Sequence, residues 1–195
     1  MRHLIICVDD TDDESKSTST GEIAEIIASS AQELGATILL GISRHQLLLD
    51  PSIQYTSHNS SMAFEALIDN DKYEQLYKLA VRAIDENKVA AADPGLCIVD
   101  LPSDTDDALA NINKLIAFGQ KAKREVCSKD EAYALADSIP WVDLSEHGGD
   151  GSGVIGAIAG VGLRLSGNDG RFRGKWNLRS RRKCWCKDRS ALTLP

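Results

Sequence analysis

The sequence has no long hydrophobic run and no amino-terminal segment with the composition of a secretory signal. Its first apolar segment, residues 4–8, runs directly into Asp9 and Asp10, and no segment approaches the roughly 20 apolar residues of a membrane helix. The five cysteines are odd in number and lack the spacing of a disulfide framework. These absences predict a cytoplasmic protein that does not bind membranes.

Three common ligand-binding signatures are also missing. Gly151, Gly153 and Gly156 match a literal G-x-G-x-x-G, but the residues after the following helix do not supply the strand that a dinucleotide fold needs. No Walker lysine follows these glycines. An EF-hand is disfavoured because a strand precedes the acidic residues and Ser15 stands where the loop requires glycine.

The charge of the chain is unevenly distributed. Net charge is −7, yet residues 171–189 carry nine Lys or Arg against one acid, which leaves 13 basic and 28 acidic side chains elsewhere. An acidic body repels nucleic acid unless a local basic patch or a metal intervenes. Residues 171–195 are therefore a separate basic tail, with three interpretations: an RNA-binding arm, a disordered end, or a non-native ending produced by a change of reading frame.

Apolar strand-like runs alternate with helical patterns along residues 1–170, which predicts a single α/β domain. Because a helix joins the first two strands, we expect a mixed or mostly parallel sheet with flanking helices. Residues 61–68 fit either a strand or a short helix. The expected strands are residues 2–8, 36–43, 96–101 and 141–144, and the expected helices are 21–34, 71–86, 104–124, 131–137 and 154–165.

Acidic residues cluster directly after the first strand: Asp9, Asp10, Asp12, Asp13 and Glu14. In α/β sheets ligands bind at this end of the strands. Crowded carboxylates raise one another's pKa unless a cation balances them, and Mg²⁺ takes one or two carboxylates together with phosphate oxygens. The cluster thus predicts a metal site for an anionic nucleotide. Two alternatives are a solvated turn that caps the next helix and an aspartyl-phosphate phosphatase with Asp10 as nucleophile and Asp12 as acid.

Two further loops precede helices, where free backbone amides favour anions. The first contains Thr18, Ser19 and Thr20, whose alternative role is plain helix capping. The second is a glycine-rich segment whose alternative role is a packing turn; its candidate phosphate contacts are Gly149, Gly151, Ser152 and Gly153. Arg44, His45, His58 and Asn59 are additional candidates for contacts with phosphate or base.

These motifs together resemble a known family. Residues 6–12 (Ile-Cys-Val-Asp-Asp-Thr-Asp), the hydroxyl-rich loop through Thr20, and residues 149–157 (Gly-Asp-Gly-Ser-Gly-Val-Ile-Gly-Ala) resemble the kinase-like domain of archaeal tRNA-Ile agmatidine synthase. The resemblance covers roughly residues 3–165. It implies ATP and Mg²⁺ as cofactors and phosphorylation of a tRNA cytidine before agmatine displaces the phosphate.

The resemblance also implies roles for individual residues. Asp9, Asp10 and Asp12 match metal and phosphate ligands, and Ser19 falls where the family has a reactive threonine. We predict Asp10, Asp12 and Ser19 as catalytic residues. The predicted nucleotide contacts are Thr11, Thr18, Thr20, Gly149, Gly151, Ser152 and Gly153.

The sequence departs from the family in three places. The family's Gly and Cys in the first loop are absent, its Arg-Gly-Asn-Gly reads Ser-His-Asn-Ser at residues 57–60, and no ferredoxin-like, OB or zinc-ribbon segment follows. We therefore expect a standalone ATP- and Mg²⁺-dependent phosphoryl-transfer domain whose acceptor the sequence does not identify. A non-catalytic nucleotide-sensing module remains the alternative.

Overall fold

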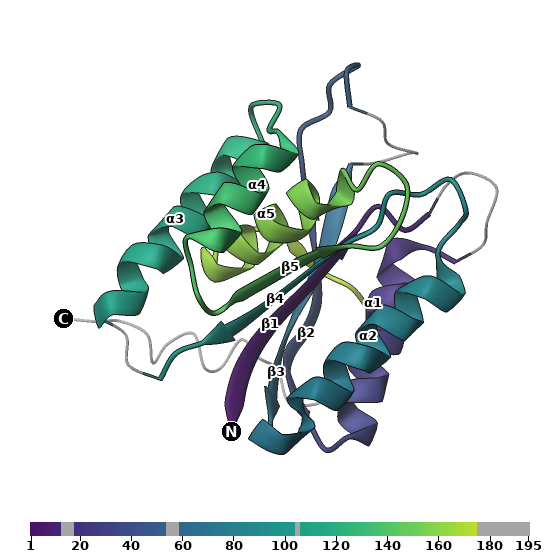
Figure 1. Cartoon of the computed structure of the whole chain (residues 1–195), viewed down its shortest axis with the longest axis vertical. Helices are drawn as coiled ribbons and strands as arrows, with labels where there is room; N and C mark the ends of the chain where they lie inside the picture. Colours follow the sequence, from purple (N-terminus) through teal and green to yellow (C-terminus); the bar gives the residue numbers. More distant parts are fainter. Residues whose placement is uncertain (13–17, 54–58, 104–105, 175–195) are drawn as a thin grey trace, which may run out of the picture.

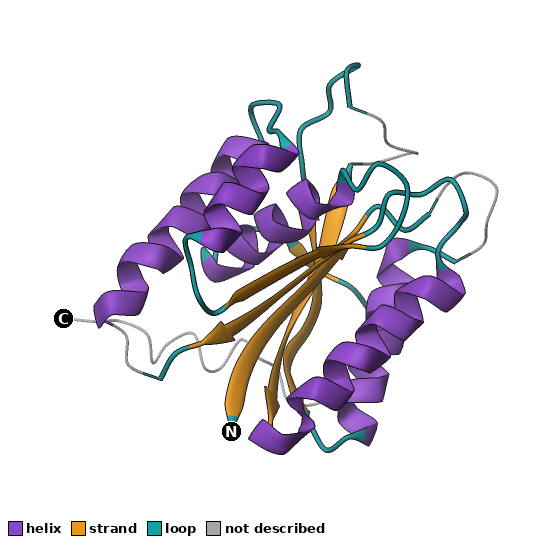
Figure 2. Cartoon of the chain, viewed as in Figure 1, coloured by secondary structure: helices purple, strands orange, loops and turns teal. Residues whose placement is uncertain are grey.

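The fold is a single sheet with helices on both faces, as the α/β pattern predicts. The computed structural model describes residues 1–12, 18–53, 59–103 and 106–174. Helices α1 (Thr20–Glu33) and α2 (Tyr73–Asn87) cover one face, and α3 (Asp106–Ala122), α4 (Lys129–Asp137) and α5 (Gly153–Leu165) cover the other (Figures 1 and 2). A short 3₁₀ turn, Asn70–Lys72, precedes α2.

The sheet has the strand order β5-β4-β1-β3-β2-β6, and every neighbouring pair is antiparallel. Residues 61–68, left open by the sequence, are a strand. The six strands are β1 (Arg2–Asp9), β2 (Thr37–Gln46), β3 (Ser60–Ile68), β4 (Gly95–Leu101), β5 (Val142–Glu146) and β6 (Arg171–Phe172).

The first two strands are not adjacent parallel strands, although a helix joins them. Strand β2, which follows α1, does run in the same direction as β1. The two strands are not neighbours, because β3 lies between them and is antiparallel to both. This is the split βαβ arrangement of β-α-β-β-α-β folds. Sequence periodicity does not reveal it, because a parallel crossover and a split crossover use the same strand and helix patterns.

Strand β1 is buried on both faces and separates two hydrophobic cores. Leu4, Ile6 and Val8 pack toward α1 and α2, whereas Ile5 and Cys7 pack toward α3, α4 and α5. The alternation follows from the period of two in an extended strand. The same alternation directs the side chain of Asp9, two residues after Cys7, toward α5.

All five predicted helices are present, with ends shifted by only a few residues. In the part of the chain that the structure describes, no helix has both the length and the apolar character needed to cross a bilayer.

Helix α5 packs unusually close to its neighbours because four of its residues are glycines. A Cβ at Gly160 would lie 2.3 Å from Ser61 Oγ and 2.5 Å from Cys7 Sγ, and a Cβ at Gly162 would lie 1.9 Å from the carbonyl oxygen of Leu115 in α3. These two glycines therefore permit close packing of α5 on β1, β3 and α3.

Substitution of Gly162 by alanine is expected to lower the free energy of unfolding by about 1 to 3 kcal/mol, because the added methyl group meets rigid backbone of α3. Denaturant unfolding measures the change. The matched control is Gly21→Ala in α1, where the methyl group meets only the flexible guanidinium of Arg173. A Gly162→Ala variant as stable as Gly21→Ala would contradict the close α3–α5 packing.

Candidate functional site

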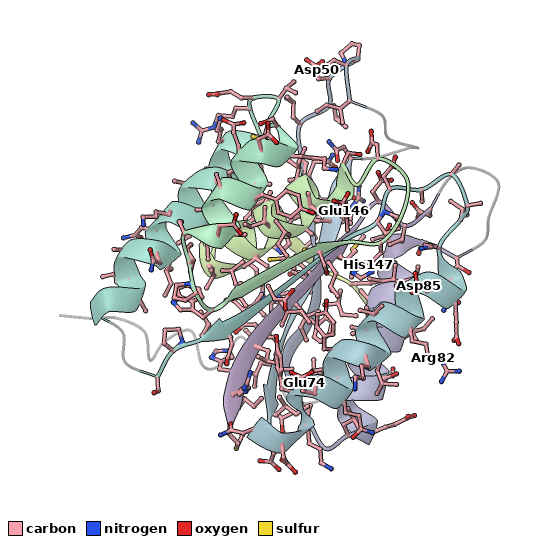
Figure 3. The ribbon with its side chains drawn as sticks, in the orientation of Figure 1. Asp50, Glu74, Arg82, Asp85, Glu146 and His147 are labelled. Atoms are coloured by element: carbon pink, nitrogen blue, oxygen red, sulfur yellow. The ribbon has the colours of Figure 1, made fainter. Side chains whose placement is uncertain are left out.

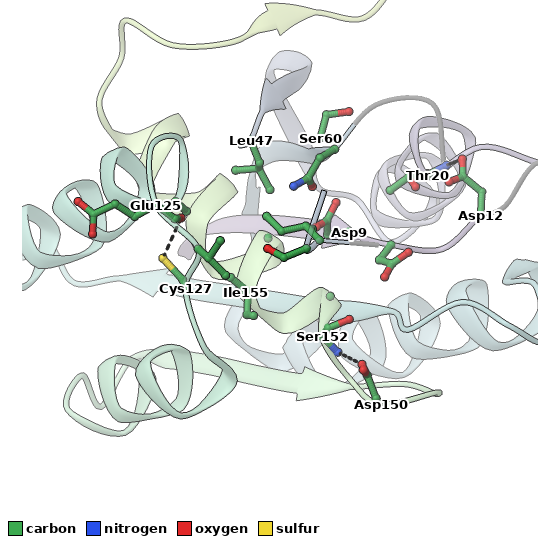
Figure 4. Close-up of a pocket in the computed structure, with 18 residues that line it drawn as sticks. Asp9, Asp12, Thr20, Leu47, Ser60, Glu125, Cys127, Asp150, Ser152 and Ile155 are labelled. Atoms are coloured by element: carbon green, nitrogen blue, oxygen red, sulfur yellow. Dashed lines mark hydrogen bonds between the residues drawn. The ribbon is translucent and has the colours of Figure 1, made fainter. Parts of the chain in front are cut away.

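A cavity of about 340 Å³ lies at the carboxyl end of β1, between the amino termini of α1 and α5 (Figure 4). Segments far apart in the sequence line it: the acidic turn after β1, the loop after β2, the start of β3, the end of α3 and the start of α5. The lining residues are Asp9, Asp10, Asp12, Thr20, Leu47, Ser52, Ile53, Asn59, Ser60, Ala122, Glu125, Val126, Cys127, Asp150, Ser152, Gly153, Ile155 and Gly156.

The charged groups in this lining are all acidic. Five of the described lining residues are carboxylic acids, namely Asp9, Asp10, Asp12, Glu125 and Asp150, and none is Lys, Arg or His. Like charges held together in a partly desolvated space raise each other's energy. A bound cation would relieve this repulsion, so the donor set suits a divalent metal.

Asp9 forms the buried floor of the cavity, with only 7% of its surface exposed. Burial raises the pKa of its carboxyl well above the ordinary value, and the neighbouring Asp10 raises it further. A Cβ at Gly156 would lie 1.7 Å from Asp9 Oδ2, so the helix can approach this carboxyl only because residue 156 is glycine.

Asp10 follows Asp9 in the left-handed backbone region. Its φ is 53°, a conformation that non-glycine residues adopt uncommonly and that Asp and Asn adopt more readily than most. Burial raises the pKa of Asp10 to about 6, and Asp93, Asp12 and Asp150 contribute in the same direction. Asp93, which the sequence analysis did not identify, thus belongs to the electrostatic surroundings of the site.

Asp12 and two threonines fix the start of α1. Asp12 Oδ2 accepts a hydrogen bond from the Thr20 amide at 3.0 Å, and the buried Thr11 hydroxyl donates to Thr20 Oγ1 at 3.0 Å. Of the three, Asp12 and Thr20 line the cavity.

Ser19 forms a capping box with Glu22. Its hydroxyl donates to Glu22 Oε2 at 3.0 Å and accepts from the Glu22 amide at 3.3 Å. Neither Ser19 nor Thr18 is among the lining residues. In this conformation the structure therefore gives Ser19 the capping role that the sequence analysis left open as its alternative.

The glycine-rich segment does not present free amides to the cavity. Each amide from Asp150 to Ile155 already donates to a protein oxygen: that of Asp150 to Asp93 Oδ1, that of Ser152 to Asp150 Oδ1 at 2.8 Å, and that of Gly153 to the carbonyl of Asp93 at 2.9 Å. Gly149 and Gly151 adopt positive φ values of 56° and 74° and lie outside the lining. The segment brings Ser152, Gly153 and the Asp150 carboxylate to the cavity.

The three predicted metal ligands do not form a complete metal cage. Across the described ranges, no three His, Cys, Asp or Glu side chains are placed to hold an ion by themselves. Mg²⁺ in nucleotide sites characteristically takes one or two carboxylates and completes its shell with water and phosphate oxygens. Asp9 and Asp10 are the acids that would provide carboxylate oxygens for that mode, while one oxygen of Asp12 accepts a hydrogen bond from the Thr20 amide.

Part of the cavity lining is apolar and was not predicted. Leu47, Ile53, Ala122, Val126 and Ile155 come from three separate segments, and no local sequence signal marks them as neighbours. They provide a surface on which a flat, uncharged group can pack beside the acidic floor.

The candidates for contacts with phosphate or base, which lie near the end of β2 and before β3, have different environments. Arg44 donates from Nε to Ser60 Oγ at 2.9 Å, and Ser60 lines the cavity. His45 is fully buried between Ser43 and Asp169 and has no access to a ligand. Asn59 lines the cavity, whereas His58 lies outside the described residues.

Asp10→Asn is expected to stabilise the ligand-free protein at neutral pH. Because the pKa of Asp10 in the folded chain, about 6, exceeds the ordinary value of 3.8, its stabilising contribution is present below about pH 4 and is lost as the pH rises through 6. The variant should therefore exceed the native chain by about 1 to 3 kcal/mol at pH 7 and lose that advantage near pH 4. Denaturant unfolding across this pH range measures both, and a constant difference would contradict the assigned pKa.

Comparison with known proteins gives a structural relationship. No protein-family profile matches the chain, and no curated protein sequence matches it. Among solved structures, the complex of TiaS with an isoleucine tRNA and ATP aligns with 25% identity and a TM-score of 0.69 over 83% of this chain and 36% of that one. A tRNA fluorescent labeling enzyme aligns with 25% identity and a TM-score of 0.67 over 82% and 36%.

A further match is apo TiaS, described as an agmatidine synthetase for isoleucine tRNA, with 24% identity and a TM-score of 0.65 over 82% of this chain and 35% of that one. The chain thus spans about a third of the length of the proteins it matches. The described residues have a TiaS-like fold, in agreement with the resemblance that the acidic and glycine motifs indicated.

Proposed function

We propose that this domain binds ATP with Mg²⁺ and transfers a phosphoryl group to an RNA acceptor. The observation that carries the proposal is the cavity at the end of β1, whose described charged residues are all acidic. Its place in a TiaS-like fold supports the choice of ligand, because TiaS has been crystallised with ATP and an isoleucine tRNA. In phosphoryl transfer the protein contributes mainly positioning and charge neutralisation, which an acidic, partly enclosed site with a bound metal can provide.

Each part of the cavity has a role in this proposal. Asp9 and Asp10 hold the metal, which when bound neutralises the phosphates and the carboxylates together. Ser152 and Thr20 lie at the starts of α5 and α1, where the helix dipoles favour negative charge. The apolar wall around Ile155 and Val126 holds the base, so that the phosphates point to the acidic side.

A metal bound at Asp10 would also lower the pKa of this carboxyl, which burial and the neighbouring acids raise. Without a cation, burial and neighbouring acids raise the pKa of Asp10 to about 6. A divalent ion at the carboxylate favours its ionised form, so magnesium-dependent binding should strengthen as the pH rises from about 5 to about 7, values that bracket this pKa of about 6.

A second candidate is a nucleotide-binding module without turnover. It is favoured by the capping box that occupies Ser19 and by the internally bonded amides of the glycine-rich segment. In this case ATP and Mg²⁺ would bind at the same carboxylates, but no group in the cavity would receive or direct the phosphoryl group.

Turnover distinguishes the two candidates. With radiolabelled ATP, Mg²⁺ and bulk tRNA, the native chain is expected to release or transfer the terminal phosphate, and Asp10→Asn should slow this at least about a hundredfold. The matched control is Asp137→Asn, an exposed acid of α4 outside the cavity, which should leave the rate unchanged. Binding of ATP without turnover would reject the transferase and support the second candidate.

Ser19→Ala tests the two roles of that residue in one variant. Loss of the cap is expected to cost about 1 kcal/mol of folding stability, measured by denaturant unfolding. Radiolabel on the protein itself, measured in parallel, reports phosphorylation. If label appears on the native chain and disappears in Ser19→Ala but not in Thr18→Ala, Ser19 is also the acceptor; unchanged labelling restricts it to capping.

A further inference from the structure

The edge of the sheet formed by β2 and β6 carries an unusual arrangement of basic and aromatic side chains. Arg44 on β2 lies directly opposite Arg171 on β6, and Phe172 and Arg173 follow. The rest of the chain is strongly acidic, so a group of arginines beside the cavity requires explanation. This edge adjoins the cavity, since Arg44 hydrogen-bonds the lining residue Ser60.

Two arginines at directly paired strand positions repel each other. Paired side chains lie on the same face of a sheet, and like charges placed opposite one another are destabilising. Arg44 bonds only the neutral groups of Ser60 and Gln46, and within the described residues neither Arg44 nor Arg171 has a carboxylate partner. An anion between these two guanidinium groups would remove the repulsion.

Arg173 anchors the end of this edge on α1. Its Nε donates to Glu25 at 2.6 Å, and its guanidinium lies against Gly21 in the first turn of the helix. This places β6 beside the helix whose amino terminus forms part of the cavity. The next residues in the sequence, 175–189, add seven of the nine basic side chains in the segment 171–189.

Phe172 is exposed on the other face of the same strand. Its exposed fraction is 58%, and the guanidinium of Arg164 lies 5.3 Å from its ring centroid. Arg164 is itself fixed by hydrogen bonds to Glu65 and Ser43 at 2.8 Å. The ring thus packs on the fixed guanidinium of Arg164 on one side and is otherwise largely exposed to solvent.

The segment that carries β6 is held firmly in place. Asp169 accepts hydrogen bonds from the buried His45, at 3.0 Å, and from Lys123, which follows α3. Burial lowers the pKa of His45, so at neutral pH its ring is uncharged and serves as a hydrogen-bonding link. The arginines and Phe172 are therefore presented by a fixed edge and not by a free chain end.

We propose that the β2–β6 edge binds a single-stranded segment of RNA that passes around the edge strand β6, with phosphates at Arg44 and Arg171 on one face and a base stacked on Phe172 on the other. Basic side chains together with an exposed aromatic ring are the groups by which proteins bind unpaired RNA. The inference extends the proposed function by naming the surface that delivers the acceptor to the cavity. The inference rests on the proposed function only for the role of the bound RNA as phosphoryl acceptor, because RNA binding itself is measurable without ATP.

The test is fluorescence anisotropy of a labelled, unpaired RNA oligonucleotide of mixed sequence with the full chain, in the absence of nucleotide. Arg171→Ala is expected to weaken binding roughly tenfold and to reduce the salt dependence by about 0.7 in the slope of log K against log salt, as for one lost phosphate contact on a single strand. Phe172→Ala should weaken binding at least about fivefold, and Phe172→Tyr should restore it.

Matched controls lie on other surfaces. Arg82→Ala removes an exposed arginine of α2 that points away from the sheet (Figure 3), and Leu109→Ala removes an apolar side chain of α3 with 56% exposure. Neither should change RNA affinity. The proposal is overturned if the native chain does not bind the oligonucleotide, if the controls lose as much affinity as the edge variants, or if magnesium-ATP displaces the RNA while Arg171→Ala has no effect.

The same preparations separate this inference from the proposed function. Magnesium-ATP affinity, measured by calorimetry, should be equal in the native chain and in Arg171→Ala. RNA binding that depends on the edge, together with no ATP binding, would reject the phosphotransferase and retain the RNA surface. ATP binding without RNA binding would reject the edge alone.

Discussion

Negative charge concentrated in a partly buried space is the constraint around which the site is organised. Asp9 and Asp10 follow a strand that is buried on both faces, so their carboxyls cannot move freely into solvent, and Asp93 and Asp150 come close from two other segments. The raised pKa values of Asp9 and Asp10 show that the folded chain tolerates their ionisation poorly. A divalent cation held by Asp9 and Asp10 would relieve this repulsion and would supply the positive charge that a phosphate group needs in order to bind beside these acids.

Helix α5 makes this concentration of charge structurally feasible. Glycines at 156 and 160 bring its backbone onto Asp9 and Cys7, and Gly162 brings it onto α3. Gly95 and Gly153 are in equally close contact, since a Cβ at Gly95 would lie 2.2 Å from the Gly153 backbone. The acidic turn after β1 and the start of α5 are thereby held together, and the loop after β2 and the end of α3 close the apolar side.

The sequence predicted the local parts of the molecule better than their assembly. Strands, helices and the acidic turn are encoded by short-range patterns, so the sequence alone predicts Asp9, Asp10, Asp12 and Thr20 as site residues. The insertion of β3 beside β1 and the wall formed by Leu47, Ile53 and Val126 depend on long-range pairing, which one sequence does not display. The sequence favours free backbone amides for phosphate in the glycine-rich segment. In the structure these amides are occupied by internal hydrogen bonds, above all those to Asp93, which no sequence pattern indicates.

Isothermal titration calorimetry of the folded protein at neutral pH tests the central claim most directly. The account predicts that magnesium and ATP together give saturable binding with one site per chain. It also predicts that ATP alone binds far more weakly, because the described lining residues include no basic side chain, and that Asp10→Asn abolishes the magnesium-dependent part. Equal heats for ATP with and without magnesium, or no heat from a protein shown to be folded by its unfolding transition, would contradict it. The acidic turn would then serve only to cap α1.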